Sequence, residues 1–182
     1  MDLKESNQYS DEVKEKWGKT TQYKEYEEKS ENRFKEEFEN INDKFMIIVR
    51  DNINNVDEFN LLYDLVGWGS YDKNISKKAL DNTYYSVSVY DDDKIIGYGR
   101  LVGDAICFMY IHDVIVLPEY QNKKIGTMIM NKLLDKIKEI QNENPNLRTY
   151  LGASKGKEEF YEKFGFVKRI DADLGYGMIL MK

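Results

Sequence analysis

The chain has 182 residues, of which 41% are hydrophobic and 33% charged, so it is long enough to fold as one full domain with its own core. Its net charge of −6 argues against a nucleic-acid-binding surface, because phosphate backbones are bound by clustered basic residues. A single cysteine excludes an internal disulfide, and with a single histidine it argues against a zinc site. No apolar run is long enough to span a membrane and residues 1–11 lack the apolar core of a signal peptide, so we expect a cytoplasmic protein without a membrane partner.

Residues 1–44 differ in composition from the rest of the chain. They contain nine Lys/Arg and thirteen Asp/Glu, a net charge of 9 − 13 = −4, and no proline. Ser10 can cap a helix that ends at Gly18, and a second helix can begin at Thr20 or Thr21. The apolar residues at helical spacing form a thin stripe: Val13, Trp17, Tyr23, Tyr26, Phe34, Phe38 and Ile41. We therefore expect a helical hairpin that packs on the main domain or on a second copy, which makes a homodimer a candidate assembly.

This N-terminal extension also resembles part of a known domain. The stretch YSDEVKEKWGKTTQYKEYEEKS (9–30) is similar to a segment of the drug-sensing effector domain of MerR-like regulators of the thiostrepton-induced type. The remaining helices of such a domain are missing, so the resemblance implies packing or dimerisation rather than antibiotic sensing.

From residue 45 onward, strand and helix patterns alternate. Asn55 and Glu58 resemble a capping pair that opens a helix, and this helix should stop at Gly67. The other expected helices span 76–80, 125–140 and 157–165. The expected strands are 45–51, 84–90, 94–102, 107–117, 147–153, 166–169 and 177–181. This order predicts an α/β domain with a mixed sheet, in which Cys107 is buried and is not a nucleophile.

The stretch VIVLPEYQNKKIGT (114–127) joins a strand to a helix through a basic loop. Amides at a helix N-terminus are unused donors and the helix dipole adds positive charge, so an anion is stabilised there. Gly126 allows close approach of the backbone, Thr127 offers a hydroxyl, and Lys123 and Lys124 add charge. The pattern is typical of a phosphate-binding turn, and the alternative is an ordinary solvated turn that enters a helix.

Two motifs in this part of the chain resemble those of one enzyme superfamily. The pattern V-x-V-x-P-x-Y-Q-x-x-x-x-G resembles motif A of the GNAT superfamily of acetyl-CoA-dependent N-acyltransferases, whose signature is Q/R-x-x-G-x-G/A. Gln121 and Gly126 occupy its first and last positions, and Lys124 stands where the family usually has its first glycine. EEFYEKFGF (158–166) resembles motif B, F-Y-x-K-x-G-F. The resemblance covers 45–182 and implies an N-acetyltransferase domain there, behind the 1–44 extension.

The resemblance implies a GNAT fold, with a splayed, mixed and mostly antiparallel sheet flanked by helices. It also implies acetyl-CoA as co-substrate and no metal. The implied cofactor-binding residues are Val114, Val116, Gln121, Asn122, Lys123, Lys124, Ile125, Gly126 and Thr127. We expect Lys124 to adopt a backbone conformation near that of a right-handed helix, and to weaken pyrophosphate binding rather than abolish it.

The chemistry implied by the resemblance is direct attack of a small-molecule primary amine on the acetyl-CoA thioester. Tyr161 matches the family's general acid, and its alternative role is packing against aromatic neighbours. His112 matches a position used to relay the amine proton, for which an imidazole pKa of about 6.5 is suitable, and its alternative role is structural. Asp113 is the second candidate base, with orienting a loop or binding the amine as its other uses. Strand alternation places Tyr110, His112, Val114 and Val116 on one face, and Ile111, Asp113 and Ile115 on the other.

The substrate pocket is less clearly marked. The resemblance places Trp68, Tyr110 and Asp113 at the acceptor side, which suits a small amine. A rival hypothesis from a different class is a non-catalytic acyl-CoA-binding or ligand-binding regulatory module, in which Lys124 marks a decayed cofactor loop.

Overall fold

The computed structural model describes residues 46–52 and 54–180. These divide into two compact units, 46–152 and 153–180, which are described separately. The helical hairpin expected over 1–44 lies outside the described residues and stays a prediction, as does the domain boundary at 44/45.

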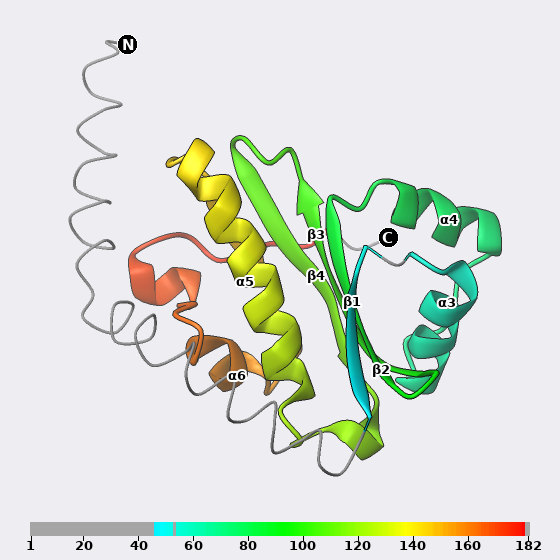
Figure 1. Cartoon of the computed structure of the whole chain (residues 1–182). Coiled ribbons are helices and arrows are strands. Elements are labelled where there is room, and N and C mark those ends of the chain that lie inside the picture. The colour runs from blue at the N-terminus through cyan, green and yellow to red at the C-terminus, as the bar shows by residue number, and fades with distance from the viewer. Residues whose placement is uncertain (1–45, 53, 181–182) are drawn as a thin grey trace. The chain divides into compact units, whose positions relative to one another are not determined.

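The first unit contains one five-stranded sheet in the order β1-β2-β3-β4-β5 (Figure 1). Its strands are β1 (Ile47–Asp51), β2 (Tyr85–Asp91), β3 (Lys94–Gly103), β4 (Phe108–Val116) and β5 (Arg148–Leu151). The first four strands pair antiparallel, whereas β5 pairs parallel to β4. The sheet is therefore mixed and mostly antiparallel, as predicted.

Helices cover both faces of this sheet. Figure 1 shows α5 (Ile125–Glu143) on one face, and α3 (Val56–Leu65) and α4 (Lys73–Asp81) on the other. The Asn55 side chain caps α3 as predicted, accepting hydrogen bonds from the amides of Asp57 (2.9 Å) and Glu58 (3.2 Å). The predicted start of α4 at Ser76 is wrong, because Asp72 caps the helix three residues earlier by accepting from the Asn74 amide at 2.9 Å.

Helix α5 packs closely on β3. The spacing of the apolar residues in 125–140 predicts a buried face of Ile125, Met128, Ile129, Leu133, Ile137 and Ile140; all six are buried, and Met130 is buried with them. A Cβ on Gly99 would lie 2.5 Å from Ile129 Cγ2, and a Cβ on Gly97 would lie 3.0 Å from Ile129 Cδ1. The two glycines therefore allow the helix to approach the strand.

The second unit contains α6 (Glu158–Glu162) and a short 3₁₀ helix, η2 (Arg169–Ala172). Helix α6 is shorter than the predicted 157–165 segment, and a turn follows it to Gly165. The strands predicted at 166–169 and 177–181 are wrong for the residues described there, which form η2 and irregular chain. Backbone groups in this segment bond locally, with the amide of Leu174 donating to Arg169 O at 2.9 Å, instead of joining a ladder.

Candidate active site

Strand β4 contains a bulge at Asp113. Arg100 of β3 pairs with His112 and Tyr98 pairs with Ile115, so β4 has one residue more than β3 over this interval. Asp113 has a left-handed backbone (φ 53°), and its carboxylate lies 2.5 Å from the His112 ring. His112 and Asp113 therefore share a face of the sheet.

This bulge corrects the predicted alternation. A regular strand would place His112 and Asp113 on opposite faces, and every residue after the bulge is shifted by one position. Val114 lies on the α5 face, since its Cγ2 is 3.8 Å from the position of a Cβ on Gly99. The two candidate cofactor residues Val114 and Val116 thus face away from His112, since Val116 pairs with Gly97, which faces α5.

The Asp113 carboxylate is buried among three donors from three elements. The Tyr63 hydroxyl of α3 donates to Oδ1 at 2.5 Å, Arg100 Nε of β3 donates to Oδ2 at 2.5 Å, and His112 Nδ1 lies 2.5 Å from Oδ1. Only 1% of the Asp113 side chain is exposed. Arg100 is held in turn by the Ala79 carbonyl, which accepts from Nη1 at 2.8 Å.

The partners of Asp113 keep it ionised. Burial on its own would raise the pKa of Asp113, but the His112 hydrogen bond, the Arg100 charge and the Tyr63 hydrogen bond together hold that pKa below its ordinary value. Burial and the hydrogen bond to Asp113 raise the pKa of Tyr63, so its hydroxyl remains a neutral donor. The site therefore contains a buried anion whose oxygens are both engaged by protein donors.

Aromatic side chains surround this cluster. The Tyr110 ring centroid lies 5.9 Å from that of His112, and the Tyr63 centroid lies 5.3 Å from that of Trp68 and 5.6 Å from that of Tyr71. The side chain of His112 is 50% exposed, and Trp68 and Tyr71 are exposed to a similar extent. The structure thus links the predicted acceptor residues Trp68, Tyr110 and Asp113 to His112 through a continuous set of contacts.

The predicted phosphate turn follows β4. It begins with a 3₁₀ helix, η1 (Pro118–Tyr120), and passes through two left-handed residues, Asn122 (φ 61°) and Lys124 (φ 64°). The expectation that Lys124 lies near the right-handed helical conformation is wrong. The chain reverses direction directly before α5, and this reversal uses the left-handed conformation that glycine adopts most readily.

Helix α5 begins with backbone amides that precede its first helical hydrogen bond. The first helical hydrogen bond runs from the Met128 amide to Lys124 O (3.0 Å), so the amides of Ile125, Gly126 and Thr127 precede it. Gln121 Nε2 donates to Val116 O at 3.1 Å and ties the turn to the end of β4.

The ammonium group of Lys123 is held beside the same turn. Its Nζ lies 5.0 Å from the ring centroid of Tyr120, whose hydroxyl donates to Asp91 Oδ2 at 2.8 Å. One of the two lysines predicted to supply charge therefore lies over an aromatic ring next to the turn.

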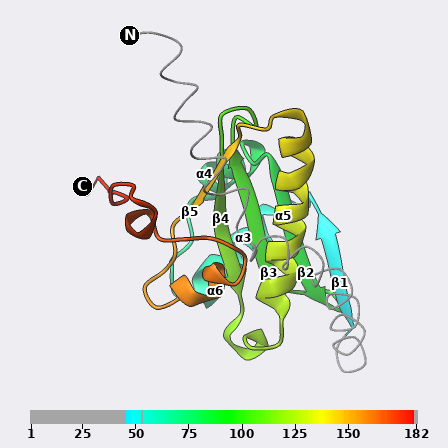
Figure 2. The same cartoon turned by 90° about the vertical axis from the view of Figure 1, so that its left-hand side faces the viewer.

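Strand β4 extends beyond its parallel partner. Pairing with β5 covers only Phe108–Ile111, so within the part of the chain that the structure describes, His112–Val116 has no strand on that side (Figure 2). This is the splay that the sequence resemblance implied. The open edge joins His112 to the phosphate turn.

Tyr161 lies on α6 in the second unit. Its ring centroid is 5.0 Å from that of Phe160, which is 5.2 Å from that of Phe164. Burial raises the pKa of Tyr161. The phenol therefore keeps its proton at neutral pH.

The sequence matches the family model described as the acetyltransferase (GNAT) domain over residues 67–175. This chain belongs to the GNAT family. Residues 9–58 of this GNAT protein match the model of the TipAS antibiotic-recognition domain, which confirms the second resemblance.

Individual relatives agree with the family. An uncharacterized ycf52-like N-acetyltransferase of Prochlorococcus marinus is 33% identical over 60% of this chain and 61% of its own length, so the GNAT chain spans about three fifths of that relative. A probable acetyltransferase from meticillin-resistant Staphylococcus aureus has a TM-score of 0.66 at 28% identity, covering 75% of this chain and 99% of its own. An aminoglycoside 6′-N-acetyltransferase complexed with coenzyme A shares the fold, with a TM-score of 0.54 at 18% identity over 65% of this chain and 83% of its own.

Sequence reasoning missed two residues of this GNAT site, Tyr63 and Arg100. A signal was present for Arg100, because it interrupts the apolar strand IIGYGRLV (95–102) and faces the strand that carries Asp113. A charged residue within an apolar strand usually needs a buried partner. Tyr63 carries no such signal, since an aromatic residue on an amphipathic helix is ordinary core.

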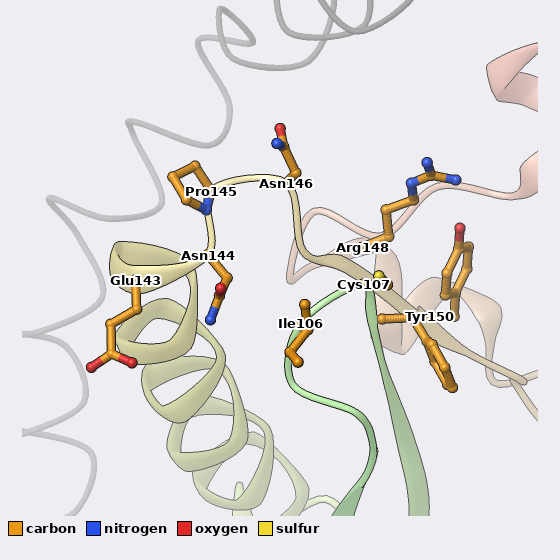
Figure 3. Close-up of a pocket in the computed structure, with 9 residues that line it drawn as sticks. Ile106, Cys107, Glu143, Asn144, Pro145, Asn146, Arg148 and Tyr150 are labelled. Atoms are coloured by element: carbon orange, nitrogen blue, oxygen red, sulfur yellow. The ribbon is translucent and has the colours of Figure 1, made fainter. Parts of the chain in front are cut away.

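A separate surface pocket of about 670 Å³ lies where α5 ends and β4 begins (Figure 3). Cys107 lines it and is exposed, so the prediction that it is buried is wrong. The physical reason is the turn before β4, in which Asp104 Oδ1 accepts from the amides of Ile106, Cys107 and Phe108 at 2.8–3.0 Å and holds Cys107 outside the sheet.

Residues 46–52 and 54–180 of this GNAT chain lack two further features. They contain no group of three or more histidine, cysteine or acidic side chains placed to bind a metal ion. None of their helices has the length and apolar character needed to cross a bilayer.

Proposed function

We propose that this protein transfers the acetyl group of acetyl-CoA to the primary amine of a small molecule by direct attack. The observation that carries this proposal is the open edge of β4, which has His112 and its aromatic neighbours at one end and the anion-binding turn at the other. A linear cofactor with a phosphate group at one end and a thioester at the other matches this arrangement.

The residues of the turn fit the phosphates. Lys124, at the position of the family glycine, has a left-handed backbone, and the amides of Ile125, Gly126 and Thr127 that follow it precede the first hydrogen bond of α5 and can donate to a phosphate. Lys123 and Lys124 supply charge, and Gln121 and Asn122 border the turn. The backbone edge at Val114 and Val116 is the partner for the pantetheine arm. The coenzyme A complex of the aminoglycoside enzyme with the same fold supports this choice of donor.

Two side chains carry the proton transfers in this proposal. His112 takes the proton of the attacking amine, directly or through a water molecule, because its ring is half-exposed and a carboxylate holds its other nitrogen. Tyr161 protonates the departing thiolate, and burial favours the protonated phenol that this role needs. An amide of the open β4 edge stabilises the negative oxygen that forms on the thioester carbon.

The acceptor amine binds beside His112 in this proposal. Trp68 and Tyr110 offer aromatic faces, which attract cationic and apolar groups. Trp68 is folded back towards Tyr63 by its amide, which donates to Tyr63 O at 2.9 Å. Asp113 acts through His112 rather than on the amine, because its oxygens are already engaged. We place this reaction in the cytoplasm, with dimerisation through residues 1–44.

The test combines acetyl-CoA calorimetry with a screen of amine acceptors in which free thiol is detected. Tyr161→Phe should lower turnover at least tenfold and leave acetyl-CoA affinity nearly unchanged, because only the phenolic hydroxyl is lost and the ring is kept. Tyr176→Phe is the matched control, since this tyrosine lies in the same unit and is 75% exposed. Unchanged turnover in Tyr161→Phe would refute the acid assignment. Absence of cofactor binding at millimolar concentration would favour the regulatory-module alternative.

A further inference from the structure

The proposed reaction uses His112 but does not explain why its neighbour Asp113 collects so many donors. Tyr63, Arg100 and His112 approach this carboxylate from α3, β3 and β4, at 2.5 Å each. Two of these partners are internal, with 11% of the Arg100 side chain exposed and Tyr63 buried. The third partner, His112, is the chain's single histidine and is half-exposed. The cluster therefore connects a rigid interior anion to one accessible imidazole.

The chemistry of the donors determines the histidine tautomer. Arg100 and the Tyr63 hydroxyl both donate to the carboxylate, so Asp113 stays an acceptor. An ionised carboxylate at 2.5 Å from Nδ1 requires a proton on that nitrogen. In the neutral ring, Nε2 is then left with a lone pair, which is the form that a general base needs.

We propose that Asp113, Arg100 and Tyr63 are positioning residues that fix His112 as a base acting through Nε2. This inference rests on the proposed acetyl transfer for its purpose, whereas the tautomer and the orientation of the ring follow from the geometry alone. The bulge makes the arrangement possible, because only the extra residue in β4 places His112 and Asp113 on one face.

Tyr63 also joins this cluster to the acceptor side. Its hydroxyl contacts Asp113, while its ring packs against Trp68 at 5.3 Å and Tyr71 at 5.6 Å between centroids. A displacement of the half-exposed Trp68 or Tyr71 ring would therefore shift Tyr63 and its hydrogen bond to the carboxylate that orients His112. Amine binding and base orientation share this one residue.

A purely structural role is the competing explanation. The buried Arg100–Asp113 pair could serve the fold without taking part in chemistry, because removing either partner would leave an uncompensated buried charge. Among the described residues, the titratable or charged groups beside His112 are its ring contacts Tyr110 and Asp113 of β4 and its register partner Arg100 of β3. Tyr63 of α3 reaches Asp113, and Tyr150 of β5 is the register partner of Tyr110. Helix α4 contributes the Ala79 carbonyl to Arg100. A structural pair predicts a loss of stability in its variants but no defined histidine tautomer.

Nitrogen NMR of the full chain labelled with ¹⁵N-histidine distinguishes the two, because a single histidine gives a single assigned ring. The spectrum is recorded about two pH units above the ordinary imidazole pKa of about 6.5, without cofactor or amine. We expect wild-type protein to show the form protonated at Nδ1. A spectrum dominated by the form protonated at Nε2, or an equal mixture of the two, would overturn the proposal.

Asp113→Asn should invert this tautomer. The Arg100 side chain has only donors, so it donates a hydrogen bond to the oxygen of the new amide. The amide NH₂ group then faces His112 and Tyr63. Nδ1 becomes an acceptor and the ring proton moves to Nε2, which removes the base. With the acceptor found in the screen, we expect turnover at least a hundredfold lower and an acetyl-CoA Kd within twofold of wild type. An unchanged tautomer in a folded Asp113→Asn protein would overturn the inference.

Tyr63→Phe covers the case in which Asp113→Asn does not fold. It leaves Arg100 on the carboxylate, so the tautomer should persist while turnover falls three- to tenfold. Tyr90→Phe is the matched control, because this buried tyrosine also loses a hydroxyl that donates to a carboxylate, Glu58 Oε2 at 2.8 Å, but outside the Asp113 cluster, and it should keep wild-type turnover. Equal turnover in Tyr63→Phe and Tyr90→Phe would refute the positioning role of Tyr63. The NMR result needs no turnover, so a wrong tautomer counts against this inference, whereas absence of acetyl transfer counts against the proposed function.

Discussion

The replacement Lys124→Gly tests the phosphate turn most directly. Lys124 caps α5 with φ 64° and ψ 1°, in the left-handed region. A residue with a Cβ costs about 1–2 kcal/mol there. Glycine removes that cost but loses more chain entropy on folding, by roughly 0.5–1 kcal/mol. We therefore expect Lys124→Gly to raise the free energy of unfolding by about 0.5–1 kcal/mol, or Tm by about 1–4 °C in a chain of this size.

Two control variants isolate the backbone effect from the loss of charge. Lys124→Ala removes the same ammonium group and keeps the Cβ, so the difference between the glycine and alanine variants reports the conformation alone. Lys123→Gly lies in the same turn at a residue outside the left-handed region, and should destabilise by about 0.5–1 kcal/mol. Urea unfolding followed by circular dichroism measures all three.

The same variants test acetyl-CoA binding. Removing the Cβ lets phosphate approach the amides of Ile125 to Thr127 more closely, so the glycine variant should bind acetyl-CoA several-fold tighter than the alanine variant by calorimetry. The reasoning is refuted if Lys124→Gly is no more stable than Lys124→Ala, because the residue would then not need a left-handed backbone.

Three further predictions follow from packing, capping and charge. Gly99→Ala should cost about 1–3 kcal/mol in the free energy of unfolding, because its Cβ would lie 2.5 Å from Ile129 Cγ2, and a chemical unfolding curve that matches wild type would contradict this packing. Asn55→Ala should lower the free energy of unfolding by about 1 kcal/mol and Asn55→Asp by far less, since only the alanine leaves two amides of α3 without the cap. Equal losses of stability in the two variants would show that capping is not the cause. The folded-state pKa of Asp113 is lowered, so its contribution to stability is present above the ordinary carboxyl pKa of about 3.9 and is lost as the pH falls through the folded value. Unfolding free energies measured from about pH 5 down to about pH 3 should therefore fall more steeply in wild type than in Asp113→Asn, and parallel curves would show that Asp113 is not the titrating group.

Local patterns predicted most of the fold. The prediction of helix α5 is correct because five isoleucines and leucines recur at helical spacing, and an apolar face of that length is seldom compatible with a strand or a loop. The start of α3 was correct because the Asn55 cap acts within three residues of itself. The strands predicted at 84–90 and 94–102 are correct because three aspartates at 91–93 separate two apolar runs. Each of these features depends on neighbours in sequence.

The errors have a common cause, which is dependence on partners distant in sequence. The bulge at Asp113 is set by the register between β3 and β4, and the local sequence of residues 112–114 contains no signal for an extra residue. Lys124 has a left-handed backbone, which residues other than glycine rarely adopt, so the residue type gives no signal for it. The apolar stretch at 177–181 has the composition of a strand, but a strand also needs a ladder partner. In the sequence, Arg100 and Asp113 are two separate charged residues, and only the pairing of β3 with β4 brings them together.

The bulge in β4 also determines which changes of length this domain can accept. Inserting one more residue after the bulge, between Asp113 and Val114, would shift the pleat by one position, so Val114 and Val116 would rotate away from α5 and Ile115 would rotate towards it. The error would continue to the residues that lead into α5, since Gln121 is anchored on the carbonyl of Val116. An insertion of the same size in the turn between β2 and β3 would only lengthen a hairpin loop. The middle of β4 therefore does not tolerate a change of length, whereas the end of the neighbouring β3 does.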